Sequence, residues 1–348
     1  MLFYELACHP EVFSKQYLLQ HNVAIKQIFK NIKEKGSIGN LQDGKWELTI
    51  KEKIATLDND IIKEAKLKTQ LQQILKILQT RKKFIFHKKV IDEMDWLKII
   101  DKEKEDFSVI LTMLTSSYTY AAEDLLDSKL WENMIKTSSE YATQDEEYIK
   151  HEIKPILHNA QQIDLIDPYF DITKEKYKKP FKIIVDLLSN NNIAKKVNLS
   201  IHIKNQNNNK ADVIDRPKYL EQWHEIFKNN HCLQVECTLY VWKESDTDTM
   251  HDRYIIRDES FCAVLPSGID ERKKNRTVWS DIGYDNIDGI LNDFRADSSP
   301  FKLVAQVTKE EICLVWKGVL QPKKNKENAT IEQNINTRGG LKIVKRRR

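Results

Sequence analysis

The fold class is decided by the stretch VNLSIHIK at residues 197–204, in which apolar and polar side chains alternate strictly. A period of two is that of a β-strand with one buried face. Around this stretch the pattern predicts strands at 163–167, 235–241, 251–257 and 261–265, and helices at 181–188 and from Pro217 onward. Strands that alternate with helices predict an α/β sheet domain.

The first half of the chain has a pattern typical of helices. Between Thr49 and Lys83 there is no Pro or Gly, and apolar residues recur at helical spacing, which predicts one long helix or two in line. Residues 92–116 predict another helix, and the glycine-rich stretch 36–48 is expected to be a loop or a short hairpin. We therefore expect three parts: a mostly helical domain at 1–158, an α/β domain at 159–320, and a basic, disordered tail at 321–348.

Charge and composition narrow the class of protein. The 348 residues carry a net charge of +4, yet residues 321–348 alone carry +7, from nine Lys or Arg and two Glu. Such a tail attracts nucleic acid or another polyanion in a salt-sensitive way, or it only keeps the chain soluble. No apolar run approaches the roughly 18 residues of a membrane span, and we see no signal peptide. Five scattered cysteines favour the reducing cytoplasm over a disulfide framework or a structural zinc site.

A candidate site lies in MHDRYIIRDESFCAVLPSG, residues 250–268. On a strand, His251 and Arg253 share one face, and Asp258 follows in the turn. The guanidinium of Arg253 offers fixed donors to phosphate oxygens, and His251 can attack phosphorus to form a covalent intermediate. A carboxylate such as that of Asp258 can hold one ring nitrogen of the histidine. This set demands neither a metal ion nor a cofactor. The alternative is a His and an Arg that are merely solvated at a strand edge.

The same residues resemble a known family. The run from His251 to Asp258 is similar to the H-x-K-x4-D signature of the phospholipase D superfamily, and Leu165 to Phe170 resembles the first strand of its domains. The resemblance spans about residues 160–305 and implies an α/β/α sandwich, a phosphohistidine intermediate and no metal ion. It also implies two motifs facing each other across a twofold axis, one histidine as the nucleophile and the other as the acid. Because this chain has one complete motif, we expect a homodimer.

The chain departs from the family pattern in three ways. Arg253 stands where the family usually has Lys, which keeps the charge but widens the side chain. The turn at 266–268 reads Pro-Ser-Gly instead of Gly-Ser-x-Asn. His202 and Lys204 imitate the start of a second motif, but Asn209 stands where the acid belongs. They form either a degenerate half-site or an ordinary strand and loop.

Other residues are candidates for substrate contact. Asp167 follows the first strand, at the edge where α/β sheets place ligands, or else it caps a helix. Asp281 is either an additional acid in the cleft or a surface carboxylate. Together with Asp167 and Asp281 we expect Ser267, His202 and Lys204 to bind substrate. We expect Tyr169 and Phe170 to belong to the core rather than to a platform for stacked bases.

These features predict a metal-independent nuclease that acts on DNA or RNA. A helical module ahead of a single-motif domain is similar to bacterial restriction and phage-defence effectors, so that role is expected by analogy. The alternative is a catalytically inactive subunit of the same fold that binds nucleic acid or a partner protein in a defence complex. A lipid phosphodiesterase is disfavoured because the sequence has no membrane-binding segment.

Overall fold

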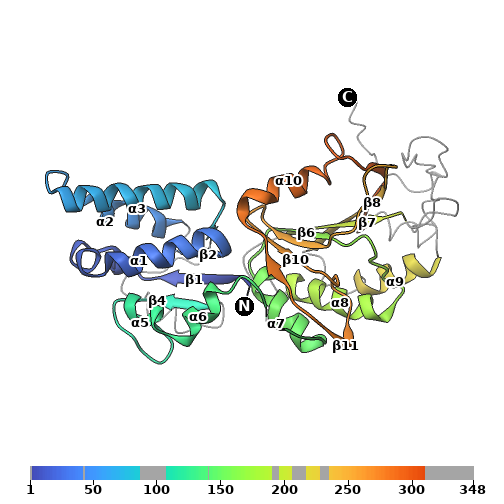
Figure 1. The fold of residues 1–348 in the computed structure, drawn as a ribbon, viewed down its shortest axis with the longest axis horizontal. Coiled ribbons are helices and arrows are strands. Elements are labelled where there is room, and N and C mark those ends of the chain that lie inside the picture. Colours follow the sequence, from blue (N-terminus) through green and yellow to red (C-terminus); the bar gives the residue numbers. More distant parts are fainter. Residues whose placement is uncertain are drawn as a thin grey trace, which may run out of the picture.

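The protein forms two bodies, each built on its own β-sheet (Figure 1). The structure is a computed structural model that describes residues 2–41, 44–86, 107–139, 141–189, 196–205, 217–227 and 235–309. In Figure 1 the N-terminal body is blue to turquoise and the C-terminal body is green to orange. The basic tail at 321–348 lies outside the described residues.

A small parallel sheet lies in the N-terminal body, which we had expected to be mostly helical. Its strand order is β3-β2-β1-β4, and every neighbouring pair is parallel. The strands are β1 (Tyr4–Cys8), β2 (Gly36–Asn40), β3 (Phe84–Phe86) and β4 (Val109–Leu111). The N-terminal region is therefore α/β, and the helical expectation was incomplete.

Strands β2 and β4 lie where the sequence pattern predicted other structure. Strand β2 occupies the beginning of the stretch expected to be a loop, and all five of its residues are buried. A Cβ on Gly36 would lie 3.0 Å from the Tyr4 ring, so this glycine permits close packing and does not make a turn. Strand β4 lies inside the predicted helix 92–116. Residues 92–106 of that prediction lie outside the described residues.

Helices surround the first sheet. Residues 49–83 are mainly helical as predicted, but they form parts of two helices that pack against each other instead of one continuous rod. Buried side chains from several helices and the sheet make one apolar core. The helices of this body are α1 (Lys15–Lys35), α2 (Lys45–Ala55), α3 (Ile62–Thr80), α5 (Ala122–Leu126), α6 (Lys129–Ile135) and the short 3-10 helix η1 (Pro10–Phe13).

The C-terminal body contains a seven-stranded mixed sheet of order β12-β10-β9-β6-β7-β8-β13. Strands β6, β7 and β8 are parallel, and β9 runs antiparallel beside β6. This confirms the α/β sheet expected from the period-two stretch at 197–204, which is β7. The strands are β6 (Gln162–Ile166), β7 (Val197–Lys204), β8 (Val235–Lys243), β9 (Tyr254–Arg257), β10 (Phe261–Val264), β12 (Ser280–Asp281) and β13 (Lys302–Thr308).

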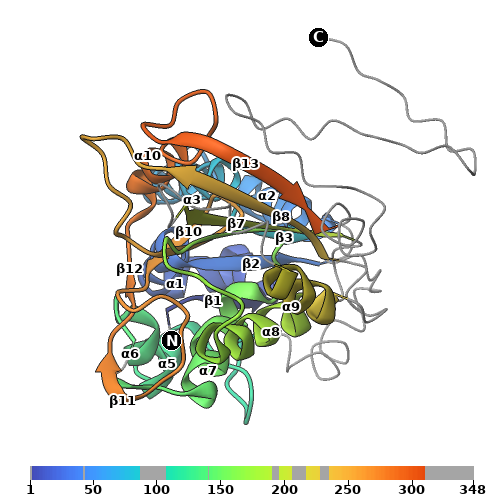
Figure 2. The same cartoon turned by 90° about the vertical axis from the view of Figure 1, so that its right-hand side faces the viewer.

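Helices cover both faces of this sheet (Figure 2). On one face lie α7 (Glu146–Leu157), α8 (Glu175–Ser189) and α9 (Pro217–Phe227). On the other lies α10 (Ile287–Asn292), preceded by the 3-10 helix η6 (Tyr284–Asn286). Helix α7 packs into the core of this sheet, and β5 (Ala142–Gln144) before it pairs with β11 (Arg272–Thr277). Both α7 and β5 therefore pack with the C-terminal body, although they precede the domain boundary expected at residue 158.

Buried polar contacts join the two bodies. Arg257 in β9 forms an ion pair with Glu5 in β1, with 2.7 Å between Nη2 and Oε1. Lys83, just before β3, donates from Nζ to the carbonyl oxygens of Ser260 at 2.7 Å and Glu34 at 3.2 Å. The hairpin between β9 and β10 is therefore attached directly to the N-terminal body.

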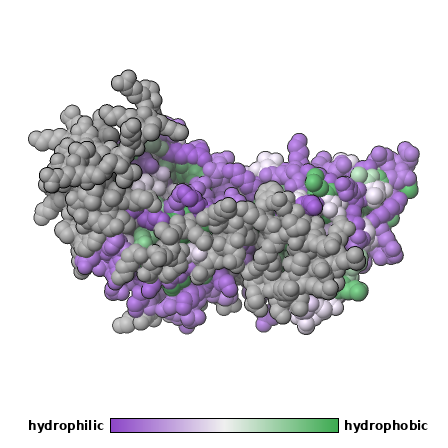
Figure 3. Space-filling view, turned by 180° about the vertical axis from the view of Figure 1, so that it is seen from behind, coloured by the Kyte–Doolittle hydropathy of each residue, from purple (hydrophilic) through white to green (hydrophobic). Residues whose placement is uncertain are grey.

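The surface of the described residues is mainly polar. Seen from behind, it is mostly hydrophilic with scattered hydrophobic residues (Figure 3). None of the helices in the described ranges combines the length and the apolar composition that crossing a membrane requires.

Candidate functional site

The candidate site lies where the first strand of the large sheet ends and the motif strand begins. Because β9 is antiparallel to β6, its first residue pairs with the last residue of β6, Ile166 with Tyr254. Asp167 therefore leaves the sheet beside the incoming segment 251–253. The motif strand itself is shorter than predicted, since regular pairing begins at Tyr254 and leaves His251 and Arg253 just outside it. This is the carboxyl edge of the parallel strands, where open α/β sheets bind ligands.

Three neighbours hold the guanidinium of Arg253. Its Nε lies 3.3 Å from Oδ1 of Asp167, an ion pair without the alignment of a hydrogen bond. Its Nη1 donates to the carbonyl oxygen of Pro266 at 2.5 Å, and the group lies over the ring of Tyr169, 4.7 Å from its centroid. Among the described residues, Nη2 has no hydrogen-bond partner. A partly exposed, oriented guanidinium with one open donor edge can bind an anion.

Asp167 is the buried counter-charge of this group. Its side chain is 0% exposed, Oδ1 accepts from the backbone N–H of Tyr169 at 3.0 Å, and Oδ2 has no hydrogen-bond partner among the described residues. Burial raises the pKa of Asp167 to about 6, although the Tyr169 N–H and the Arg253 charge act in the opposite direction. Asp167 thus holds Arg253 through a buried ion pair and has no exposed surface in this structure; its expected contact with substrate stays a prediction.

A glycine closes the site over Asp167. Gly268 has a φ of +69°, and a Cβ there would lie 2.2 Å from Oδ2 of Asp167 and 2.9 Å from Cδ of Arg253. Only glycine combines this backbone conformation with this close approach. Ser267 lies half-buried beside it, in the same turn as Pro266, and none of the described contacts involves its hydroxyl. The turn at 266–268 therefore contacts the guanidinium through its backbone.

His251 is exposed at the mouth of the site. Its Nδ1 lies 3.1 Å from the hydroxyl oxygen of Tyr169, and Nε2 is the ring nitrogen left for other contacts. Tyr169, which we had expected in the core, is therefore a site residue that contacts both His251 and Arg253. Phe170, by contrast, is buried in the core as expected.

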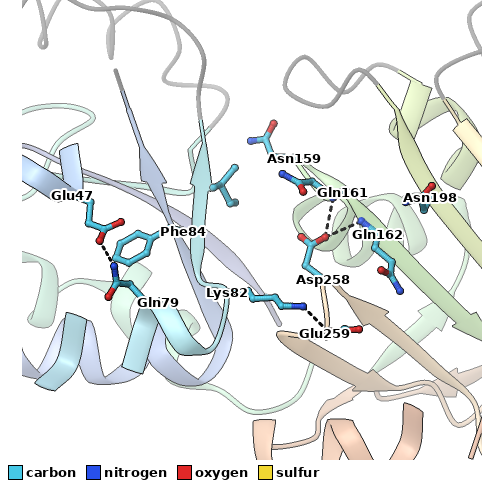
Figure 4. Close-up of a pocket in the computed structure, with 11 residues that line it drawn as sticks. Glu47, Gln79, Lys82, Phe84, Asn159, Gln161, Gln162, Asn198, Asp258 and Glu259 are labelled. Carbon is cyan, nitrogen blue, oxygen red and sulfur yellow. Dashed lines mark hydrogen bonds and ion pairs between the residues drawn. The ribbon is translucent and has the colours of Figure 1, made fainter. Parts of the chain in front are cut away.

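Asp258 does not hold the histidine ring, so the role expected of it is wrong. Its Oδ1 accepts from the backbone N–H groups of Gln161 at 2.9 Å and Gln162 at 2.8 Å, beside a cavity between the two bodies (Figure 4). At ~3.3 Å per residue, the segment from His251 to Asp258 spans roughly 20 Å, so the two side chains lie at opposite ends of β9. Asp258 fastens the β9–β10 turn to the start of β6.

His202 and Lys204, the residues of the possible half-site, lie in two different environments. His202 is 4% exposed, accepts a hydrogen bond from Nε1 of Trp242 at 3.1 Å, and stacks on Tyr240. It packs beside Phe294 on the face that α10 covers, so it is a core residue closed to substrate. The expected contact of His202 with substrate stays a prediction, which its burial does not support.

Lys204 is linked to the surroundings of His251 by the carboxylate of Glu244. Its Nζ forms an ion pair with Glu244, whose Oε1 accepts from the Met250 N–H at 2.7 Å. Burial alone would raise the pKa of Glu244, but Lys204, the Met250 N–H and the charge of His251 keep it below its ordinary value. Glu244 therefore places a negative charge beside Lys204 and within electrostatic reach of His251. Sequence reasoning missed Glu244 because no motif in the sequence marks it.

Asp281 faces the N-terminal body, away from His251. It pairs with Ala263 across the β10–β12 ladder, near the edge of the sheet. Burial raises the pKa of Asp281 to about 6, while the charges of Lys35 and Lys83 lower it. Strand β12 places it near Lys35 and Lys83 of the N-terminal body, and the structure brings it into no contact with His251 or Arg253 among the described residues.

No protein-family model matches the chain, and no curated protein matches it either. Within the described ranges, no group of three or more His, Cys, Asp or Glu side chains is arranged to hold a metal ion.

Proposed function

We propose that the C-terminal body is a phosphodiesterase of the phospholipase D type, which cleaves DNA or RNA through a phosphohistidine intermediate without a metal ion. One observation carries the proposal. The exposed imidazole of His251 and the oriented guanidinium of Arg253 share Tyr169 as a neighbour, and both keep an open polar edge, Nε2 and Nη2. A nucleophile beside a fixed anion-binding group is what attack on a phosphodiester requires.

The proposed chemistry has two steps. In the first, the lone pair on Nε2 of His251 attacks phosphorus, an N–P bond forms, and the P–O bond to the leaving oxygen breaks. The leaving oxygen keeps the electron pair of that bond and takes a proton from a general acid. In the second step, water attacks phosphorus and gives a proton to the same group, which now acts as a base; the N–P bond breaks, its electron pair returns to Nε2 of His251 and a phosphate monoester leaves. In both steps Arg253 stabilises charge on the non-bridging oxygens.

The general acid of the first step would come from a second copy of the chain. His202, the one candidate for a second motif within the chain, is buried against Trp242 and Tyr240. A twofold axis would bring the second His251 to the same phosphate. A homodimer therefore remains part of the proposal.

The arrangement of the large sheet supports the fold implied by the family resemblance. Three parallel strands, β6, β7 and β8, are followed by β9, which enters antiparallel beside β6 directly after the motif histidine. Helices lie on both faces. We propose that this body is the α/β/α sandwich of the phospholipase D superfamily.

The substrate class and the biological role follow from charge and resemblance. The net charge of +7 in residues 321–348 favours a polyanion, so we propose nucleic acid over lipid. Cys8 and Cys262 are buried free thiols, which suits a reducing compartment, and we propose a cytoplasmic protein. A phage-defence or restriction role rests on the family resemblance alone.

A second candidate is a catalytically inactive subunit that binds nucleic acid or a partner protein. It is favoured by Arg253, which stands where the family usually has Lys and which is tied to Asp167 and Pro266. A guanidinium that cannot follow the phosphate through the reaction would bind it without accelerating cleavage.

Cleavage assays distinguish the two candidates. We expect the wild-type protein to cleave labelled single- or double-stranded DNA or RNA in the presence of EDTA, and His251→Ala to lose this activity. His151→Ala is the matched control, because His151 is an exposed histidine in α7, away from the site. Binding without cleavage by the wild type would support the inactive subunit. Equal cleavage by His251→Ala would contradict the enzyme assignment.

A further inference from the structure

Tyr169 touches both functional groups of the site. Its hydroxyl oxygen lies 3.1 Å from Nδ1 of His251, and its ring lies under the guanidinium of Arg253 at 4.7 Å. We propose that Tyr169 is the positioning residue of the site: it presents Nε2 of His251 to the substrate and supports Arg253 from below. The inference deepens the proposed phosphodiesterase function and rests on it for its catalytic consequence, but not for the geometry.

The backbone around Tyr169 explains how a turn outside the sheet can position a side chain. Its N–H donates to Oδ1 of the buried Asp167, and the N–H of Phe170 donates to the Asp167 carbonyl oxygen at 3.1 Å. The carbonyl oxygen of Pro168 accepts from the Lys204 N–H at 3.3 Å. Phe170 is anchored in the core against Phe181. Tyr169 is therefore held at both sides and is directed outward at the end of β6.

A phenolic hydroxyl suits this role better than the expected carboxylate of Asp258. When the ring carries its proton on Nδ1, the hydroxyl accepts that hydrogen bond, and the lone pair of the imidazole is on Nε2. A hydroxyl can also donate, whereas an ionised carboxylate only accepts. Because the hydroxyl is neutral, it orients the ring without favouring the imidazolium form, in which Nε2 has no lone pair.

Charged groups around the histidine set its wider environment. Arg253 lies over the Tyr169 ring and is paired with Asp167, and Glu244, paired with Lys204, is close enough for the charge of His251 to lower its pKa. Asp252 is next in the chain and accepts from the Tyr254 hydroxyl at 3.0 Å. Among the described residues, the hydrogen bond that reaches a ring nitrogen of His251 joins its Nδ1 to the Tyr169 hydroxyl. The orientation of that ring should therefore depend on this hydroxyl.

The test uses two substitutions at position 169. Tyr169→Phe removes the hydroxyl and keeps the ring under Arg253, whereas Tyr169→Leu removes both. We expect Tyr169→Phe to lower kcat about tenfold, from the loss of one hydrogen bond, with KM nearly unchanged. We expect Tyr169→Leu to lower kcat and also raise KM, because the guanidinium loses its support. Tyr141→Phe is the matched control, since Tyr141 is exposed and lies over Arg276, away from the site.

A spectroscopic readout separates this inference from the proposed function. In ¹⁵N-labelled full-length protein at neutral pH, we expect the His251 ring to carry its proton mainly on Nδ1, and Tyr169→Phe to shift it toward the Nε2–H form. His251→Ala identifies the signal. If the wild type has no phosphodiesterase activity but shows this tautomer and its shift, the function fails and the positioning role stands. A wild-type ring protonated mainly on Nε2, or the same spectrum in Tyr169→Phe, overturns the positioning role. The wild-type spectrum decides the matter even if the variant does not fold.

Discussion

Arg257 of β9 and Glu5 of β1 form an ion pair of 2.7 Å, and their side chains are 1% and 2% exposed. Glu5 also accepts from Asn159 at 2.7 Å and contacts Nδ1 of His158 at 2.9 Å. Burial alone would raise the pKa of Glu5, but the charges and hydrogen bonds of Arg257 and His158 keep it below its ordinary value. Arg257, the neighbour of Asp258 in the chain, thus binds β9 to β1 of the N-terminal sheet.

Breaking this pair should destabilise the protein. Glu5→Gln leaves the buried charge of Arg257 without its counter-ion, so we expect a loss of about 3–5 kcal/mol in the free energy of unfolding by urea. Because the folded-state pKa of Glu5 is lowered, its stabilisation is present above the ordinary value of 4.5 and disappears as the pH falls below it. Glu5→Gln should remove this contribution to the loss of unfolding free energy at acidic pH. The exposed pair of Lys196 and Glu236 is the control, and Glu236→Gln should change stability little. An unfolding free energy equal to that of the wild type in Glu5→Gln would contradict the importance of the pair.

Asp167 should show the opposite dependence on pH. Its pKa of about 6 in the folded protein lies above the ordinary 3.8, so ionising it costs stability. The unfolding free energy should therefore fall by on the order of 3 kcal/mol from this group as the pH rises from about 4 to 6. Asp167→Asn should abolish that decline, as measured by urea unfolding at several pH values. The same pH dependence in wild type and variant would show that Asp167 does not titrate in this range.

Gly268→Ala should damage both the fold and the site. The left-handed backbone alone costs about 1–2 kcal/mol for a residue with a Cβ, and the added atom would collide with Asp167 and Arg253. We expect a lower melting temperature and strongly reduced activity. Gly289→Ala is the control, because a Cβ there meets nothing within 4 Å and the residue lies in α10. That change should be neutral or stabilising by about 0.5–1 kcal/mol. A Gly268→Ala protein with wild-type activity would mean that this turn does not shape the site.

Substitutions of Arg253 test its role in charge stabilisation. Arg253→Ala should lower kcat by about 10²–10³, the cost of removing one donor to a developing oxyanion. Arg253→Lys should retain part of the activity, since the charge remains but the planar fork is lost. Arg276→Ala is the control for loss of an exposed arginine. Wild-type turnover by Arg253→Ala would remove Arg253 from the mechanism.

The oligomeric state tests the origin of the second histidine. If the general acid comes from a second copy, light scattering at micromolar concentration should show a dimer, and specific activity should fall on dilution below the dissociation constant. The N-terminal body need not take part, because the candidate site lies in the C-terminal one. A strict monomer with full activity would contradict the dimer.

Local pattern predicted those elements that have one buried and one less buried face. Strand β7 alternates buried and less buried residues along most of its length, and the helices at 49–83 repeat apolar residues at helical spacing. Strands β1 and β2 have no such signal, because all five residues of each are buried. Parallel strands covered on both faces lose the alternation that identifies a strand. The N-terminal sheet was therefore missed.

By itself the sequence determined the α/β class of the C-terminal body, from the periodicity of its strands and helices, and the nearness of His251 to Arg253, which are two residues apart. Only the tertiary structure decided which other groups join them. Antiparallel pairing of β9 with β6 brings Tyr169 and Asp167 to His251 and Arg253, and the same strand carries Asp258 away. Hydrogen-bonded register between distant segments sets these neighbours, and spacing along the chain does not encode it.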